Sequence, residues 1–541
     1  MAVDARQLCK MFDGLKAGRA PWEGLWNDVV DYMRPSSQLF SSTTSPGQRR
    51  NKKIVDSTGR RALKKFASGL QGFITNPAER WFIITPEDSK LRKIPRVREW
   101  LQAVNNSMYS RLSNSKSRFY PQSHTLYMDI GAFGWGVMHF KTENGRLMFK
   151  SYPNSECYYR ENNKHIVDTL FRKFTWTAQQ VLDEFEKSKA MSEDTRQKLS
   201  EMAENKPDEK LNILHAVYPR EQRIPGVMVA TNKKYASVYS WLDQKALLDE
   251  SGFDRFPFVV PRWEILSGDS YPQAPAFDAI DDVKMANAMK RTILRAGQKA
   301  VDPPLQGPDA GFITGVNLNP AAMNRYRAGS PDRIEPIVTG SRPDFGDRLL
   351  EKVQMDIEMA FFLDQLQDDK KAEMSATEFL GRDEQRLRQM APQLGRMAAE
   401  YLDPILEGIF EEDLANGVYP PVPDELAGVN LKIMYVSPLA RAQKMMQVVQ
   451  FKRYIEDASG VMQLDPNAAD RMDGDGMMDW LQEMHDAPNQ TIRSEQEVQS
   501  VREQRAQQQQ VQEALAAGES ASKSAANLAK LPGGQGGATA Q

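Results

Sequence analysis

The sequence contains very little cysteine and histidine. Only Cys9 and Cys157 carry thiols among its 541 residues. Two isolated thiols are too few for a disulfide framework or a thiolate zinc site, which indicates synthesis in a reducing compartment. The five histidines never lie three or four residues apart, so neither a helical zinc site nor a histidine-based catalytic triad has local support. We therefore predict no metal site and no cofactor.

The chain also lacks a long apolar run. Its first residues, MAVDARQLCKMFDGLKAGRAPWEGLW, contain no apolar core of the kind that signal peptides have. No stretch approaches the roughly 18 to 20 apolar residues that a helix needs to cross a bilayer. These absences predict a protein made in the cytoplasm, with no membrane partner.

An excess of charge of one sign is missing too, because 70 Lys and Arg residues balance 72 Asp and Glu residues to a net charge of -2. No global field draws the chain toward phosphate or anionic lipid. There is no Gly-Lys dipeptide and hence no Walker-type phosphate loop. Residues 465–476 resemble a calcium-binding loop, but their carboxylates and glycine do not occupy the positions that such a loop requires. The pairs Asp281-Asp282 and Asp368-Asp369 could suggest a two-metal nuclease, but adjacent carboxylates are more often solvated. We predict that the protein is not an enzyme.

What the sequence does contain is a change of hydrophobic period along the chain. Helical spacing ends before Pro35 and recurs at 61–73, after which a β-hairpin is predicted across Asn144-Gly145. Further strands are predicted over 165–174, 211–218, 226–231, 235–242 and 256–263, with a helix over 178–205 between them. Long helices are predicted over 276–300, 344–364, 376–412 and 440–457. The fold class is therefore α+β and mostly helical.

The C-terminal part differs in composition. A capped loop is predicted to lead into a helix over 477–484. Residues 491–517 are rich in Gln, Glu and Arg, and their few apolar residues cannot support a lone helix in water, so this segment needs copies of itself. Residues 518–541 are mostly Ser, Ala, Gly and Gln, which predicts a disordered tail.

Five segments occur in an order that resembles the head-to-tail connecting (portal) proteins of short-tailed bacteriophages. Each is weak alone, but five with plausible spacing are hard to obtain by chance, and the likeness runs from about residue 5 to 460. They are VDSTGRRALKKFASGLQGFITNPAERWFII (55–84), FPFVVPRWEILSGDSYPQAPAFDAIDDVKMAN (256–287), AVDPPL (300–305), MSATEFLGRDEQRL (374–387) and YVSPLARAQ (435–443).

The resemblance implies a portal-type ring of twelve subunits at the capsid vertex of a virion, made in the host cytoplasm. The ring would conduct double-stranded DNA during packaging and ejection. Implied partners are the terminase, the tail adaptor, and the major capsid and scaffolding proteins, with internal core proteins as a further candidate. The implied division is N-terminal helices and an α+β wing (1–275), stem helices (276–300 and 344–364), a clip (301–343), a channel loop (365–375), a long wing helix and return (376–435), a helical crown (436–490), a barrel helix (491–517) and the tail (518–541).

The stem helices carry two charged stripes at helical spacing. A conduit should not bind DNA tightly, since each neutralised phosphate adds affinity, so a mixed wall suits passage. The stripes either line the channel or pair with each other and face solvent, and the sequence leaves both open. The basic stripe is Lys284, Arg291, Arg295 and Lys299; the acidic stripe is Asp344, Asp347, Glu351 and Glu358.

Two further groups of residues are candidate contacts. Arg325, Arg327 and Arg333 lie among prolines and glycines in the clip, where motor and adaptor would dock. In the channel loop, Lys370 and Lys371 are predicted to touch the DNA backbone while Asp368 and Asp369 keep that contact weak. Ser375 or Thr377 would cap the next helix, and Glu378, three residues after Ser375, would form a capping box with it. The alternative for this loop is a solvated turn on the outer wall.

Two other functions remain as alternatives. A DNA-processing enzyme of the packaging machinery is favoured only if the aspartate pairs converge on a metal. Another virion structural protein would be ruled out by a ring with a central channel.

Overall fold

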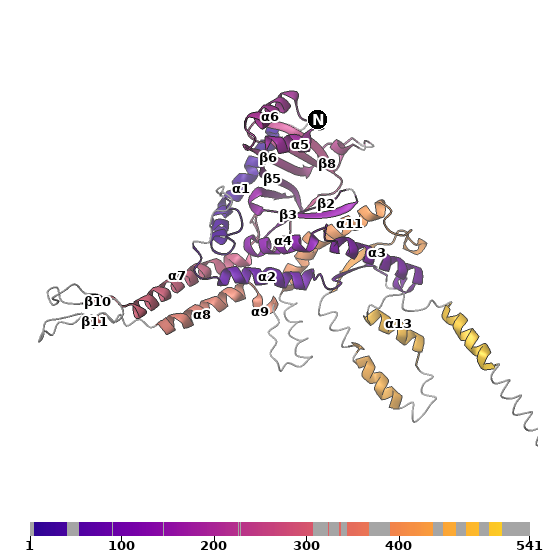
Figure 1. The fold of residues 1–541 in the computed structure, drawn as a ribbon. Coiled ribbons are helices and arrows are strands. Elements are labelled where there is room, and N and C mark those ends of the chain that lie inside the picture. The colour runs from indigo at the N-terminus through magenta and orange to yellow at the C-terminus, as the bar shows by residue number, and fades with distance from the viewer. Residues whose placement is uncertain are drawn as a thin grey trace, which may run out of the picture. The chain divides into compact units, whose positions relative to one another are not determined.

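The computed structural model (Figure 1) describes residues 5–40, 53–88, 90–143, 145–224, 227, 229–306, 317, 323, 335–336, 343–366, 390–436, 447–448, 450–460, 472–485 and 497–510. The chain divides into two compact units, Met1–Ala440 and Arg441–Gln541. Helices outnumber strands in residue count and both occur, so the predicted α+β class is confirmed.

A five-stranded antiparallel sheet forms one part of the first unit. Its order is β4-β5-β6-β7-β8. Helix α1 (Ala5–Tyr32) covers one face, where Leu8 and Phe12 pack on Phe171 and Leu214. The strands are β4 (Cys157–Glu161), β5 (Val167–Thr177), β6 (Lys210–Pro219), β7 (Tyr235–Trp241) and β8 (Ala246–Phe253).

The opposite face of this sheet is covered by two helices where the sequence predicted one. Helix α5 (Ala178–Phe185) begins with a capping box between Thr177 and Gln180, and α6 (Glu193–Asn205) begins at Ser192, whose hydroxyl accepts from Thr195 N. The second cap starts a new helix, so the single helix predicted over 178–205 is wrong.

The strand predicted over 226–231 does not form at the residues described there, 227 and 229–231. Ala230–Asn232 forms a 3-10 turn, η4. The Asn232 amide nitrogen donates to the carbonyl oxygens of Ile224 and Val227, both at 2.7 Å, and its oxygen accepts from Ile224 N at 2.8 Å. These local bonds hold the backbone in a loop in place of a strand ladder.

The predicted hairpin forms a second, smaller sheet. Strands β2 (Val137–Glu143) and β3 (Arg146–Tyr152) pair antiparallel, with Gly145 at φ 73° in the turn, and β9 (Phe258–Val259) joins β2. The strand predicted over 256–263 is reduced to two residues. Pro257 and Pro261 flank it, and proline cannot donate to a ladder.

Three more helices complete the main core: α2 (Thr58–Ile74), α3 (Pro95–Ser113) and α4 (Phe119–Phe133). Strand β1 (Phe82–Pro86) pairs with β12 (Leu431–Tyr435). The other edge of β1 is satisfied by side chains of α3: Asn105 bonds both backbone groups of Ile84, and the Tyr109 hydroxyl bonds both of Phe82. Short 3-10 turns lie at Leu91–Lys93, Asn154–Glu156 and Asp424–Leu426.

Helices α7 (Pro275–Val301) and α8 (Pro343–Ala360) form an antiparallel pair that leads away from the sheets in Figure 1. The first confirms the helix predicted over 276–300. The second ends four residues before its predicted end, because Phe362 adopts a left-handed conformation (φ 53°) ahead of the short helix α9 (Leu363–Leu366). This turn lets Phe361 pack on Phe66 while Phe362 packs on Trp263.

The helix predicted over 376–412 is described from residue 390 only. Residues 390–397 are α-helical, Ala398–Leu402 form a π-helical turn, and α11 (Asp403–Ala415) follows. Pro404 has no N–H to donate to the carbonyl of Glu400, which accounts for the widened turn at this point.

The second unit is described as three helical stretches: 447–448 with 450–460, α13 (Gly474–His485) and 497–510. Phe451 packs on Trp480, and Arg502 donates to both carboxylate oxygens of Asp475 at 2.7 and 2.8 Å. The helix predicted over 477–484 is confirmed. Those predicted over 440–457 and 491–517 are helical where described, and the tail 518–541 lies outside the described residues. Within the described ranges, no helix is both long and apolar enough to cross a membrane.

Candidate functional site

The α7–α8 pair is the most distinctive feature of the first unit. The two helices approach closely, since a Cβ placed on Gly346 would lie 2.9 Å from Ile293 Cγ1. At their far end, β10 (Leu305–Gln306) pairs with β11 (Glu335–Pro336), as Figure 1 shows. The segment between the helices therefore leaves and returns at one point.

A buried carboxylate joins the other end of the pair to α2. Asp56 is 2% exposed, and its Oδ1 accepts from Thr58 N at 2.8 Å. Its Oδ2 accepts from Lys290 Nζ of α7 at 3.1 Å and from Gln354 Nε2 of α8 at 2.9 Å. Burial alone would raise the pKa of Asp56, but hydrogen bonds from Thr58 and the Lys290 ammonium outweigh it and hold the pKa below its usual value. We call this group, with Asn287, the Asp56 junction.

Asn287 completes the junction from α7. Its side-chain oxygen accepts from the backbone N–H groups of Val55 at 2.6 Å and Asp56 at 2.9 Å, and its nitrogen donates to the Val283 carbonyl. One short segment is thus bonded to three helices at once. Sequence reasoning missed this role: Asp56 and Asn287 lie in quoted family segments, but nothing local indicates that Lys290 and Gln354 meet them.

The basic stripe of α7 is held by two different elements. Lys284 Nζ donates to Asp28 of α1 at 2.7 Å, and Arg291 Nη2 donates to the Lys53 carbonyl at 2.9 Å. The hydrogen bond that Lys284 donates to Asp28 is the main reason why the pKa of Lys284 is raised. Arg295 and Lys299, nearer the far end, are exposed.

The acidic stripe lies mostly in solvent. Asp344, Asp347 and Glu351 are exposed, while Glu358 pairs with Lys65 of α2 at 3.3 Å. Among the described residues, the partners of the two stripes come from α1, α2, the segment before α2 and, for Lys284, Asp281 of α7 itself. Whether either stripe lines a channel stays a prediction.

The other predicted contact residues lie outside the described part of the chain. These are Arg325, Arg327 and Arg333 of the predicted clip, and Asp368, Asp369, Lys370 and Lys371 of the predicted channel loop, together with the capping box at Ser375 and Glu378. What is described is the base of the clip, where β10 and β11 pair, and the start of the loop, where α9 ends at Leu366.

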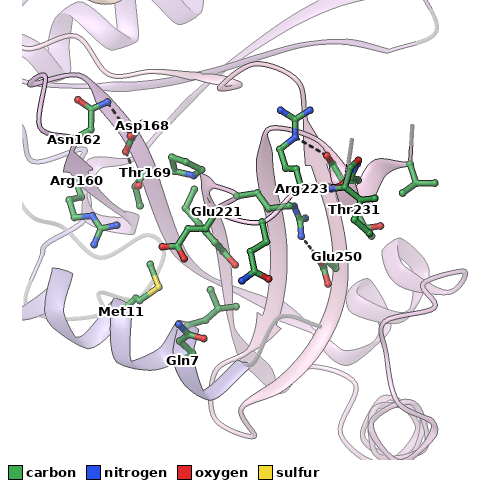
Figure 2. A pocket seen from close by; sticks show the side chains of 18 of the residues that line it. Gln7, Met11, Arg160, Asn162, Asp168, Thr169, Glu221, Arg223, Thr231 and Glu250 are labelled. Carbon is green, nitrogen blue, oxygen red and sulfur yellow. Dashed lines mark hydrogen bonds and ion pairs between the residues drawn. The ribbon is translucent and has the colours of Figure 1, made fainter. Parts of the chain in front are cut away.

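A groove of about 1240 Å³ lies beside the five-stranded sheet. Figure 2 shows Gln7 and Met11 of α1 on one side and Arg223 and Glu250 on the other. Two of its arginines are bonded within the chain: Arg220 donates to Glu250 at 2.8 Å, and Arg223 donates to the Asn232 carbonyl at 3.1 Å. The described lining contains no histidine or cysteine, so it offers neither the usual general base nor a thiol nucleophile.

A second cavity, of about 710 Å³, lies beside the π-helical turn. Here the Arg262 side chain is buried and donates to both oxygens of Glu400, at 3.0 and 2.6 Å, and also contacts Glu161 at 2.5 Å. Burial disfavours the charged guanidinium and would lower the pKa of Arg262. The hydrogen bonds to Glu400 outweigh this effect, so that the pKa of Arg262 is raised. This permanently charged clamp links the helix 390–415 to the sheet region and provides no proton donor for catalysis.

Around the aspartate pair on α7, the described residues bring no third His, Cys, Asp or Glu side chain together as metal ligands would. The Asp281 side chain is 92% exposed and lies 3.8 Å from Lys284. Over the residues that can be described, no three His, Cys, Asp or Glu side chains come together as metal ligands would. The other pair, Asp368-Asp369, falls outside them.

Two solved structures are similar to the chain at 12% sequence identity and a TM-score of 0.36. One is the neck of an empty gene transfer agent (GTA) particle, which covers 72% of this chain and 84% of its own. The other is the virion of a native GTA particle, which covers 73% and 85%.

Sequence comparison gives a closer relationship. The portal protein of Salmonella phage epsilon15 is 30% identical over 540 residues, which is 98% of this chain and 96% of that protein. The probable portal protein of Bordetella phage BPP-1 is 28% identical over 513 residues, 93% and 91% of the two chains. A family model described as bacteriophage head to tail connecting protein matches residues 5–492. The chain therefore belongs to the bacteriophage head to tail connecting protein family, as its five ordered segments predict.

Proposed function

We propose that this chain is a portal subunit that forms a ring at one capsid vertex of a virion and conducts double-stranded DNA during packaging and ejection. The observation that carries the proposal is the α7–α8 pair. Its 27-residue and 18-residue helices extend about 40 and 27 Å, a length suited to the wall of a channel. They are bonded to the α+β body at one end and close on β10–β11 at the other.

Electron microscopy of the purified full-length chain tests this function. We expect closed rings with a central opening, twelve subunits each, and a matching mass by light scattering. A monodisperse monomer at micromolar concentration contradicts the proposal.

The same proposal assigns α7 and α8 to the stem and residues 301–343 to the clip, as the docking point for terminase and then the tail adaptor. An insert whose ends meet at a two-residue ladder can project without disturbing the helices that carry it. Deleting 307–334 while keeping β10 and β11 should leave rings that neither package DNA nor bind adaptor. Normal adaptor binding by that deletion would refute the clip assignment.

We further propose that residues 365–375 form a loop that narrows the bore, with Lys370 and Lys371 touching DNA phosphates. Support comes from the described start of this segment, because α9 turns away from the line of α8 at Phe362. Replacing both lysines by alanine should leave rings intact and change genome retention or packaging in assembled heads. Unchanged packaging and retention would leave the alternative, a solvated turn on the outer wall.

The remaining assignments follow the family plan: residues 1–275 and 376–435 as wing, 436–490 as crown and 491–517 as barrel. The described helices at 450–460, 474–485 and 497–510 support a helical C-terminal unit. Truncation after residue 490 should preserve rings and remove only density beyond the crown. Loss of ring formation would show that this segment is needed for assembly instead.

A further inference from the structure

The α7–α8 pair carries opposite charge on its two sides. From Lys284 to Val301, α7 contains five basic residues and no acidic residue. Over its whole length, Pro343–Ala360, α8 contains five acidic residues and only two basic ones, Arg348 and Lys352. The contact between these two helices runs through Ile293 and Gly346. It does not require basic residues on one helix and acidic residues on the other.

The charges point away from that contact. At 3.6 residues per turn, Lys284, Arg291 and Arg295 lie roughly 160 to 180° around α7 from Ile293. By the same measure, Asp344, Asp347 and Glu351 lie roughly 100 to 160° around α8 from Gly346. The pair thus has a basic outer flank on α7 and an acidic outer flank on α8, near which Arg348 and Lys352 also lie.

The same two helices expose large apolar side chains. Phe345 is 64% exposed, Met355 62% and Met359 56% on α8, and Leu294 is 52% exposed on α7. Met355 and Met359 are four residues apart, one turn of α8, and apolar side chains this exposed are suited to be covered by another protein. The occupant must also satisfy a basic flank on one side and an acidic flank on the other.

We infer that these flanks bind each other between copies of this chain: the basic flank of α7 in one subunit packs against the acidic flank of α8 in the next. Because the two flanks lie on opposite sides of the helix pair, a single two-fold interface would bury only one flank, which would then face the same flank of the other copy, so that like charges meet. A head-to-tail contact places unlike charges together and, when it closes, generates a ring. The inference rests on the proposed ring and adds which surfaces make it: the stripes face the neighbouring subunit, not the DNA.

Charge reversal at the exposed end of each flank tests the inference. R295E/K299E changes α7, and D347K/E351K changes α8. These four residues are chosen because Lys284, Arg291 and Glu358 make contacts within the chain. Each variant replaces attraction by repulsion at every interface, so the concentration for half-maximal ring assembly should rise roughly tenfold or more, since each exposed pair contributes modestly.

Rescue separates an interface effect from a folding defect. The quadruple variant R295E/K299E/D347K/E351K restores opposite flanks and should assemble again. A 1:1 mixture of the two double variants should also assemble like the parent chain, as alternating copies, at concentrations where each double variant alone assembles poorly. K187E/K189E, which reverses two exposed lysines near the five-stranded sheet, is the matched control and should assemble like the parent chain.

The readouts are particle mass by light scattering, ring images, and DNA content of assembled heads. Impaired assembly of both double variants with recovery in the quadruple variant and in the mixture supports the inference. Normal rings from either double variant overturn it, and reduced DNA retention in those rings would place the stripe toward the channel. Failure of the parent chain to form rings would instead contradict the proposed function.

Discussion

Replacing Asp56 by alanine should loosen the attachment of α7 and α8 to α2. The substitution removes the acceptor for Thr58 N at the start of α2, a loss of about 1 kcal/mol. It also leaves the Lys290 ammonium, 3.1 Å away and about one-third exposed, without this carboxylate. Because Lys290 can partly rehydrate, we expect about 1 to 2 kcal/mol from that loss, and a total of about 2 to 3 kcal/mol.

Hydrogen-exchange mass spectrometry of the full chain is the suitable assay, since a protein of several units need not unfold in one step. Amides in the peptides around residues 53–66 and 350–360 should exchange roughly 30- to 150-fold faster in D56A, which corresponds to that free energy. Asp56→Asn keeps an acceptor for Thr58 and should show a smaller change. Asp281→Ala, on the exposed side of α7, is the control and should match the parent. Equal exchange in D56A and the parent would refute the reasoning.

Three other changes follow from buried contacts. Burial and the neighbouring cationic side chains lower the pKa of His139 from 6.5 to about 4. The unfolded chain therefore takes up a proton at His139 before the folded chain does, and the contribution of neutral His139 to stability, present above pH 6.5, is lost as the pH falls toward 4. H139Q should flatten the decline in melting temperature over that range. Gly346→Val would place side-chain atoms against Ile293; we expect a loss of about 1 to 3 kcal/mol, measurable as faster exchange in α8 but not in the five-stranded sheet. Arg262→Leu leaves the half-buried Glu400 without its partner and should lower the free energy of unfolding, measured by thermal unfolding, by about 3 kcal/mol. R262L/E400L should recover part of this loss, and no recovery would contradict the role of the Arg262–Glu400 pair.

Long amphipathic segments were the most predictable part of the fold. The α7 helix was predicted within one residue at each end, because Pro275 starts it and its apolar spacing is regular. The hairpin was equally clear from Asn144-Gly145. Both signals are local, so neighbouring residues decide the structure.

Errors arose where distant contacts decided the backbone. Phe362 breaks α8 because its ring packs on Trp263, about a hundred residues earlier, and no periodicity records such a partner. Asn232 replaces a predicted strand by folding the loop around its own side chain. The role of Asp56 was hidden for the same reason, since Lys290 and Gln354 reach it from helices far along the chain.

The charged stripes show how much of the candidate site can be predicted from the sequence of one chain. Their spacing follows from the sequence, because it depends only on 3.6 residues per turn of a helix. What each stripe faces depends on the position of the helix in the assembly, which one chain's sequence does not contain.

The two-residue ladder between β10 and β11 makes the folding of α7 and α8 independent of the sequence of the insert between them. Because the ends of the insert already meet there, lengthening or replacing the sequence between them adds only a slowly growing cost of loop closure, about 0.6 kcal/mol for each doubling. If this insert is the clip that we propose, a phage lineage can exchange it to fit a different tail while the α7–α8 pair continues to fold. Tail compatibility and channel geometry would then evolve as independent traits carried on a single gene.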